Sequence, residues 1–262
     1  MTTTSYAARD AMTMLRRNLK HAQRYPSMTV SVVMVPVFIL VLFNAVFGKA
    51  LGAGIGGVRY IDYIAPGVIL MAAASGALAT AVAVCVDKTD GIVNRFRTMA
   101  ISRASFLTGH VVGGTLQTLL SIAVVVGLAL LMGFRPSATP LEWLAATGLL
   151  GLLAFAMTWV SAAIGLVASN VESASNLPIP LQFLPFLGSA IVPTDAMPGW
   201  LRWFAQYQPF TPVIETLRGL LTGSGIGASG PIALAWCTGF GLLGYLWAKR
   251  VFTGGVAGRP AA

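Results

Sequence analysis

The sequence predicts an all-α membrane protein that crosses the bilayer six times, with an N-terminal interfacial helix and a re-entrant helical hairpin on the outer side. Of its 262 residues, 56% are hydrophobic and only 10% are charged, and the mean hydropathy is +0.78. This composition is more apolar than a soluble surface tolerates. In addition, six apolar segments are each long enough to cross a hydrocarbon core of ~30 Å at about 1.5 Å per residue.

Residues 7–25 have the pattern of a helix that lies on the membrane surface. Small and apolar residues recur on one stripe, five basic residues lie largely off it, and Pro26 ends the segment. We expect this helix to lie along the cytoplasmic leaflet, with its basic side toward lipid phosphates or a partner. A simple positive anchor before the first span is the alternative.

The six spans belong to one membrane domain that covers residues 1–262. The first is far longer than the apolar region of a signal peptide, so we expect it to be retained. Pro36 in the first span and three prolines in the fifth predict bends, since each removes a backbone donor. The spans are placed at 28–48, 63–86, 106–133, 142–169, 174–193 and 230–250.

The basic residues predict the orientation. With both termini on the cytoplasmic side of the inner membrane, 12 of the 17 Lys and Arg residues lie inside and five lie outside. They lie between apolar runs and do not form one continuous patch, which favours lipid and topology over nucleic acid as the reason for the net charge of +9.

The strongly charged run at 87–103, DKTDGIVNRFRTMAISR, separates the second and third spans. Ile92, Phe96 and Met99 recur at steps of four and three, which predicts a short amphipathic helix on the cytoplasmic side. Such a helix suits docking into a partner's groove as well as lying on lipid. A solvated basic loop that only fixes topology is the alternative.

Residues 195–223 predict two short helices that dip into the outer leaflet. Aromatic residues, Trp200 and Trp203 among them, crowd the stretch after Pro198, as they do at a membrane boundary. Thr211 then offers a cap and Pro212 the first helical position. The second helix is too short to span. An amphipathic hairpin that rests on the surface is the alternative.

Glu215 and Arg218 are spaced three residues apart in this second helix and could pair on its polar face.

No Asp, Glu, Lys or Arg lies at mid-depth in the predicted spans. Carriers coupled to protons or sodium commonly place an ionisable group on their path, so the source of energy is expected outside this chain. Most polar residues in the spans should form hydrogen bonds between helices, and a minority should face a substrate path. The candidates for the path are Asn44, Gln117, Ser121, Thr158 and Gln182.

Motifs for catalysis and for nucleotide or metal binding are missing from the sequence. It contains no GxxxxGK[ST], HExxH, CxxC or GxSxG pattern. The glycine-rich stretch at 51–57 has no strand before it and is expected to be an outer loop.

His21 and His110 have no carboxylate nearby in the sequence and are expected to be interfacial. Cys85 and Cys237 lie at different depths, so no disulfide is expected.

Three stretches together resemble the permeases of type-2 ATP-binding-cassette exporters, especially the daunorubicin-resistance-like branch of actinobacteria. The resemblance covers nearly the whole chain. It is carried by IDYIAPGVILMA at 61–72, DKTDGIVNRFRTMAISR at 87–103 and YQPFTPVIETLRGLL at 207–221. This chain departs from the family at Ala100, where a proline is common, and at Asp87 or Asp90, where a glutamate is common.

The resemblance implies six spans, a cytoplasmic coupling helix between the second and third spans, and a dimer of permeases, homomeric or heteromeric, that engages two copies of a separate ATPase. ATP and Mg²⁺ would then bind to the ATPase, and this chain would bind no cofactor and no metal of its own. By analogy, the residues on the coupling helix are Gly91, Asn94, Arg95, Phe96, Arg97 and Met99, with Ile92 added by periodicity.

The leading hypothesis is the permease half of an exporter that moves an amphipathic drug, polyketide or lipid and has no enzymatic activity. A carrier or channel driven by an ion gradient is the alternative, because mild polar residues run along the spans. A membrane enzyme acting on lipid lacks any catalytic constellation. The identity of the cargo and the direction of transport stay open.

Overall fold

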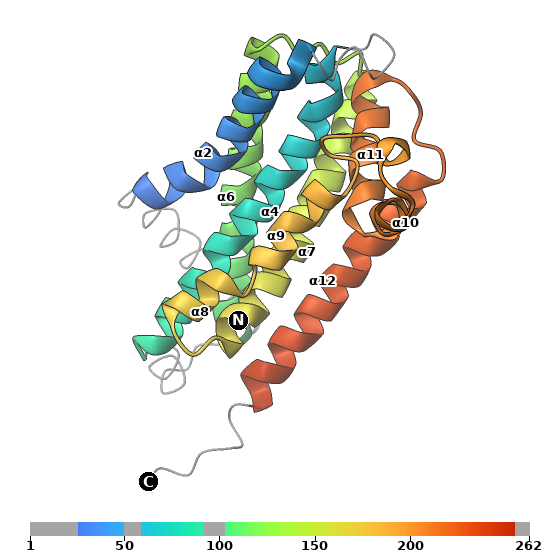
Figure 1. Ribbon diagram of the computed structural model, residues 1–262. Helices are drawn as coiled ribbons and strands as arrows, with labels where there is room; N and C mark the ends of the chain where they lie inside the picture. Colours follow the sequence, from blue (N-terminus) through green and yellow to red (C-terminus); the bar gives the residue numbers. More distant parts are fainter. Residues whose placement is uncertain (1–25, 50–58, 92–102, 255–262) are drawn as a thin grey trace.

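The computed structural model describes residues 26–49, 59–91 and 103–254, and this part of the chain is a bundle of helices without strands (Figure 1). The predicted interfacial helix at 7–25 lies outside these residues. The elements are α2 Pro26–Leu42, the π-helix η1 Phe43–Phe47, α4 Tyr60–Thr89, α6 Arg103–Leu131, α7 Pro140–Val167, α8 Val171–Asn176, α9 Ile179–Phe183, η2 Leu184–Leu187, η3 Thr194–Ala196, α10 Gly199–Tyr207, α11 Phe210–Thr222 and α12 Ser229–Gly254.

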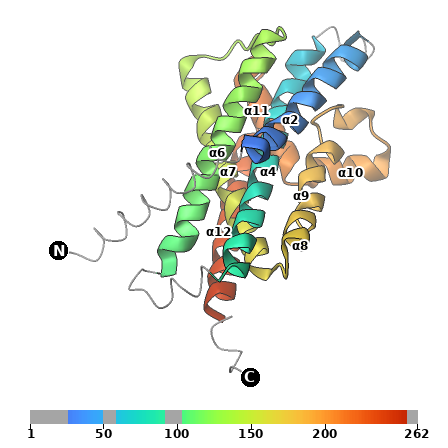
Figure 2. The ribbon, with the colours of Figure 1, turned by 90° about the vertical axis from the view of Figure 1, so that its left-hand side faces the viewer.

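Two helices form the centre of the bundle. In the most apolar stretch of α4, 82% of the residues are buried, and in that of α7 67% are buried, against 28% in α6 and 22% in α12. Helix α7 packs between α4 and α12, and α2 packs on α4 and α6 (Figure 2). The exposed side chains of α2, α6 and α12 are largely apolar, as expected of surfaces that face lipid or another apolar partner.

Glycines set how closely the helices approach. A methyl group at Gly244 of α12 would lie 2.7 Å from the backbone nitrogen of Val160 in α7. A methyl group at Gly165 of α7 would likewise overlap the carbonyl oxygen of Ala81 in α4. Small residues allow such close backbone approach, which raises the packing energy between helices in a bilayer.

The start of α7 is fixed by its own sequence. Thr139 and Glu142 form a capping box, in which the Glu142 N–H donates to Thr139 Oγ1 at 3.3 Å and the Thr139 N–H donates to the Glu142 carboxylate at 2.7 Å. Pro140 occupies the first helical position, where its missing N–H costs nothing. The helix therefore begins two residues before the predicted start of the span at 142.

Four of the described helices are long and apolar enough to cross a membrane: Tyr60–Thr89, Leu107–Leu131, Pro140–Val167 and Ser229–Thr253. They correspond to the second, third, fourth and sixth predicted spans. At the first predicted span, α2 continues into η1, and the structure has an apolar helix over Val33–Phe47. The helices at these five positions agree with the sequence pattern.

The fifth predicted span at 174–193, for which bends were predicted, is not a single bent helix. The chain is broken there into α8, α9 and η2 and then continues without regular structure to η3. Pro178, Pro180 and Pro185 explain the breaks, because each lacks an N–H and disfavours helical geometry at the residue before it. Apolar composition located this segment near the bundle, but the prolines determine its backbone.

Replacing Gly244 by alanine should destabilise the bundle, because the backbones of α12 and α7 would have to separate. We expect a loss of about 1–3 kcal/mol. Gly239→Ala on the same helix is the matched control, since a methyl group there meets nothing within 4 Å and should raise helix stability slightly. The midpoint of thermal unfolding in detergent measures both. Equal midpoints for the two variants would contradict the close contact at Gly244.

Candidate functional site

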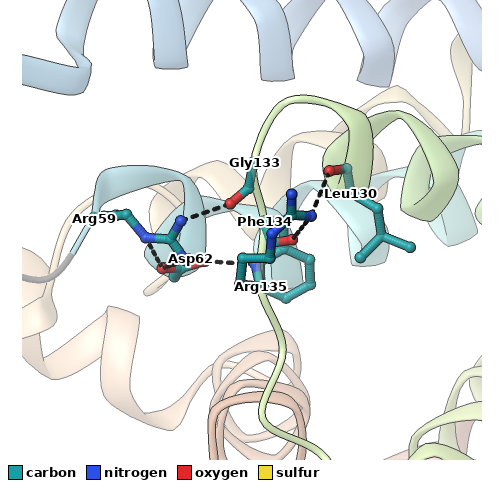
Figure 3. Close-up of polar contacts among 6 residues, drawn as sticks. All are labelled: Arg59, Asp62, Leu130, Gly133, Phe134 and Arg135. Carbon is teal, nitrogen blue, oxygen red and sulfur yellow. Dashed lines mark hydrogen bonds and ion pairs between the residues drawn. The ribbon is translucent and has the colours of Figure 1, made fainter.

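The N-terminal end of α4, which is the outer end in the predicted orientation, carries an ionic cluster that fixes it to the loop between α6 and α7 (Figure 3). Arg59 donates to the Asp62 carboxylate from Nε at 2.9 Å and pairs with it through Nη2 at 2.8 Å. It also donates from Nη1 to the carbonyl of Gly133 at 2.8 Å. The other carboxylate oxygen of Asp62 accepts from the backbone N–H of Arg135 at 3.1 Å. The carboxylate of Asp62 thus joins two connections that lie far apart in the sequence.

One turn of α4 binds the irregular segment that follows η2. The hydroxyl of Tyr63 donates to the carbonyl of Ser189 at 3.1 Å, and that of Tyr60 donates to the carbonyl of Ile191 at 3.3 Å. A methyl group at Gly67 would lie 2.7 Å from the Cα of Ala190, so only glycine leaves room there. Backbone without helical hydrogen bonds is tolerated at membrane depth only where protein covers it and satisfies its polar groups.

Arg218 of α11 completes this outer site. Its guanidinium lies 3.9 Å from the centroid of the Tyr63 ring, donates to the carbonyl of Ser189 at 2.7 Å and reaches the carbonyl of Tyr63 at 3.4 Å. Burial lowers the pKa of Arg218 from its ordinary value, and the neighbouring Tyr63 and Glu215 oppose that shift. A cation over an aromatic face contributes more when it is desolvated.

The predicted pairing of Glu215 with Arg218 is not what holds either side chain. The Glu215 carboxylate accepts a hydrogen bond from Ser229 Oγ at 3.0 Å at the start of α12, whereas Arg218 turns toward Tyr63 and Ser189. The spacing of three residues allows a local pair, but the hydrogen-bond partners of the two side chains come from α12 for Glu215 and from α4 and the segment after η2 for Arg218.

The two short helices predicted at 195–223 are present as α10 and α11, which pack on each other at the same end of the bundle as the outer site (Figure 1). Helix α10 exposes Trp200, Trp203 and Tyr207, by 77%, 67% and 68%, while Ala205 on its other side is buried. This aromatic face is typical of a helix at a membrane boundary.

The predicted cap of α11 is wrong by two residues. The helix begins at Phe210, so that Thr211 and Pro212 lie buried in its first turn. Thr211 Oγ1 donates to the carbonyl of Ala205 at 2.6 Å instead of capping α11. Proline is still tolerated at 212, because the N–H groups of the first turn have no partner within the helix.

The five candidates for a substrate path lie on four elements. Asn44 is on η1, Gln117 and Ser121 are on α6, Thr158 is on α7, and Gln182 is on α9. Gln182 donates to Ser75 Oγ on α4 at 2.9 Å, and Thr158 donates to the carbonyl of Ala154 one turn earlier. Gln182 therefore forms a hydrogen bond between helices, as predicted for most of the polar residues in the spans, whereas Thr158 bonds within its own helix.

At the C-terminal end of α4, which is the inner end in the predicted orientation, Gly91 is the last described residue before the predicted coupling helix and has φ 70°. Ile92, Asn94, Arg95, Phe96, Arg97 and Met99 lie outside the described residues.

The expectation that His110 has no carboxylate nearby is wrong. His110 Nε2 lies 3.0 Å from Asp87 Oδ2, and both side chains are buried. The two residues lie 23 positions apart, which is why the local sequence did not suggest the pair. In the described ranges, no group of three His, Cys, Asp or Glu side chains is placed to hold a metal ion.

The sequence singled out neither Asp62 nor the two tyrosines as functional residues. The sequence nevertheless contained a signal for Asp62. It is an acidic residue at the edge of a long apolar run, and a carboxylate there is expected to form an ion pair or hydrogen bonds. Tyr63 stands within the IDY part of the stretch that carries the resemblance, and Tyr60 directly precedes that stretch.

Four long apolar helices around a buried centre, with polar groups gathered at the two ends, define a multi-pass helical membrane protein. The family model described as ABC-2 type transporter matches residues 9–222, so the chain belongs to that family. The match covers α2 to α11 and includes both ends of α4.

Several named relatives are permeases. A daunorubicin resistance ABC transporter permease protein of Streptomyces coeruleorubidus is 28% identical over 238 residues, which is 90% of this chain and 83% of the relative. A probable doxorubicin resistance ABC transporter permease protein of Mycobacterium tuberculosis is 26% identical over 219 residues, or 80% and 76% of the two chains. A putative transport permease of Porphyra purpurea is 27% identical over 217 residues, or 78% and 71%.

Arg218→Gln should loosen the outer site, since it removes a charged donor from two carbonyls and from the Tyr63 ring. Hydrogen bonds to charged groups contribute roughly 1.5–3 kcal/mol, which corresponds to a fall in the unfolding midpoint of about 5 °C. Arg202→Gln is the control, because Arg202 pairs with Asp195 where both are exposed and such pairs contribute little. A fall of the same size in both variants would mean that the contacts of Arg218 carry no special weight.

Proposed function

We propose that this chain is the permease subunit of an ATP-binding-cassette exporter that moves an amphipathic drug, polyketide or lipid across the cytoplasmic membrane. The observation that carries the proposal is the match to a daunorubicin resistance permease over 90% of this chain. The chain is a membrane transport subunit of the ABC-2 family, and a separate ATPase with its own ATP and Mg²⁺ would supply the energy.

The proposed assembly contains two permeases, either identical or similar, and two copies of the ATPase. The segment at 87–103 would dock on the ATPase through Ile92, Phe96 and Met99, with Arg95 and Arg97 beside them. Both termini would lie in the cytoplasm, as the excess of Lys and Arg in the inner segments supports. Membrane lipid would be the other partner.

Coupling would start at the inner end of α4. Closure of the ATPases on ATP would push the 87–103 segment, and α4 and α6 would carry that movement into the bundle. Cargo would enter from the inner leaflet and leave past α10 and α11. Helix α4 suits this role because it is the most buried of the long helices and contacts α2, α6, α7, α8 and α11.

Arg95→Glu should abolish assembly with the ATPase, because charge reversal would place a carboxylate in a contact built for a cation. We expect co-purification of the ATPase to fall at least tenfold. Arg202→Glu, on the predicted outer side, is the matched control and should co-purify normally. Normal assembly and transport by Arg95→Glu, and likewise by Phe96→Asp, would remove the coupling role from this segment.

Transport in vesicles tests the source of energy. Wild-type permease reconstituted with its ATPase should accumulate daunorubicin, used as a fluorescent amphipathic probe, only when ATP is present. Permease alone under a proton or sodium gradient should not accumulate it. Uphill accumulation by the chain alone would establish the gradient-driven carrier instead.

A further inference from the structure

Three helices are joined at the inner end of the bundle by two consecutive residues of α4. Asp87 contacts His110 of α6 at 3.0 Å, with only 10% and 8% of their side chains exposed. The neighbouring Lys88 donates from Nζ to the carbonyl of Leu166 at 2.7 Å and to that of Ala168 at 2.9 Å, at the end of α7. The last turn of α4 therefore holds α6 through one residue and α7 through the next.

The contact of Lys88 satisfies groups that a helix cannot satisfy by itself. The last carbonyls of α7 have no N–H partner within the helix, and they carry the negative end of the helix dipole. A lysine ammonium is favourable at that position. Apolar packing supports the same convergence, since Val84 of α4, Val111 of α6 and Leu166 of α7 belong to one buried cluster.

The contact between Asp87 and His110 is less easily explained by stability than that of Lys88, because burying a carboxylate costs free energy. Replacing a buried polar pair by apolar residues is often neutral or stabilising. Packing alone therefore gives little reason for the pair. Its position gives a better one, since Asp87 lies in the last turn of α4 and His110 lies inside α6, so their contact joins the two helices on either side of the segment between them.

We propose that Asp87, Lys88 and His110 are positioning residues that make the inner ends of α4, α6 and α7 move as one body when the 92–102 segment is displaced. This inference rests on the proposed function, because it concerns how movement of the ATPase reaches the bundle. Without the contacts of Asp87 and Lys88, a displaced segment would bend the end of α4 and leave α6 and α7 behind.

The test compares Asp87→Asn, His110→Gln and Lys88→Gln in the full-length permease reconstituted with its ATPase in vesicles. Asp90→Asn is the matched control, because Asp90 is an exposed carboxylate at the same end of α4. Two quantities are measured: daunorubicin exported per ATP hydrolysed, and the change in amide hydrogen exchange that ATP causes in residues 163–168 of α7. Co-purification and the unfolding midpoint report whether the complex is intact.

We expect export per ATP to fall at least tenfold in the three variants, while co-purification and ATP hydrolysis stay within twofold of wild type. The change in exchange at 163–168 should be lost in the variants and kept in Asp90→Asn. The exchanged pair Asp87→His with His110→Asp should regain part of the export that each single variant loses.

Variants that keep the ratio of export to hydrolysis and the exchange response of wild type would overturn the inference. It would also be overturned if export fell only in proportion to the amount of intact complex, since that result describes a purely structural role. Measurements on the wild-type permease test the proposed function separately. If the wild type neither binds an ATPase nor exports the probe with ATP, the proposed function is wrong, and the coupling role, which rests on it, is wrong as well.

Discussion

The structure depends on the polar contacts at the two ends of one buried helix. Helix α4 runs through the centre of the bundle, so a charge or an unpaired carbonyl near it can form few hydrogen bonds with water. At its outer end, Asp62 accepts a hydrogen bond from the α6–α7 connection. Tyr63 donates to the segment after η2, and its ring contacts the guanidinium of Arg218. The positions of the surrounding elements follow from those few contacts.

The middle of the bundle is held by fit more than by charge. A methyl group at Gly76 of α4 would overlap the side chain of Thr118 on α6, and one at Gly114 of α6 would overlap Thr80 on α4. A glycine of each helix thus packs against a threonine of the other, and the two backbones approach closely at both contacts. Van der Waals contact of this kind drives helix association in lipid, where apolar surface alone gives no preference for a partner.

Hydropathy and cap residues were enough to find most of the helices. The predicted spans at 63–86 and 142–169 lie within three residues of α4 and α7 at each end. The three prolines of the fifth segment predicted bends, but the chain there is divided into separate short helices. Neither the outer site nor the Asp87–His110 contact at the other end of α4 was predictable from spacing, because Arg218 and Tyr63 lie 155 positions apart and Asp87 and His110 lie 23 apart. Local rules do not reach contacts that exist only after the helices pack.

The segment after η2 has a consequence for how this protein can vary. Its carbonyls at Ser189 and Ile191 depend on side chains that come from α4 and α11. The Ser189 carbonyl accepts from both Tyr63 and Arg218, and the Arg218 guanidinium also lies over the Tyr63 ring, so a substitution at one of these two positions changes the environment of the other. Among descendants of this gene, Tyr63 and Arg218 should be replaced together or kept together.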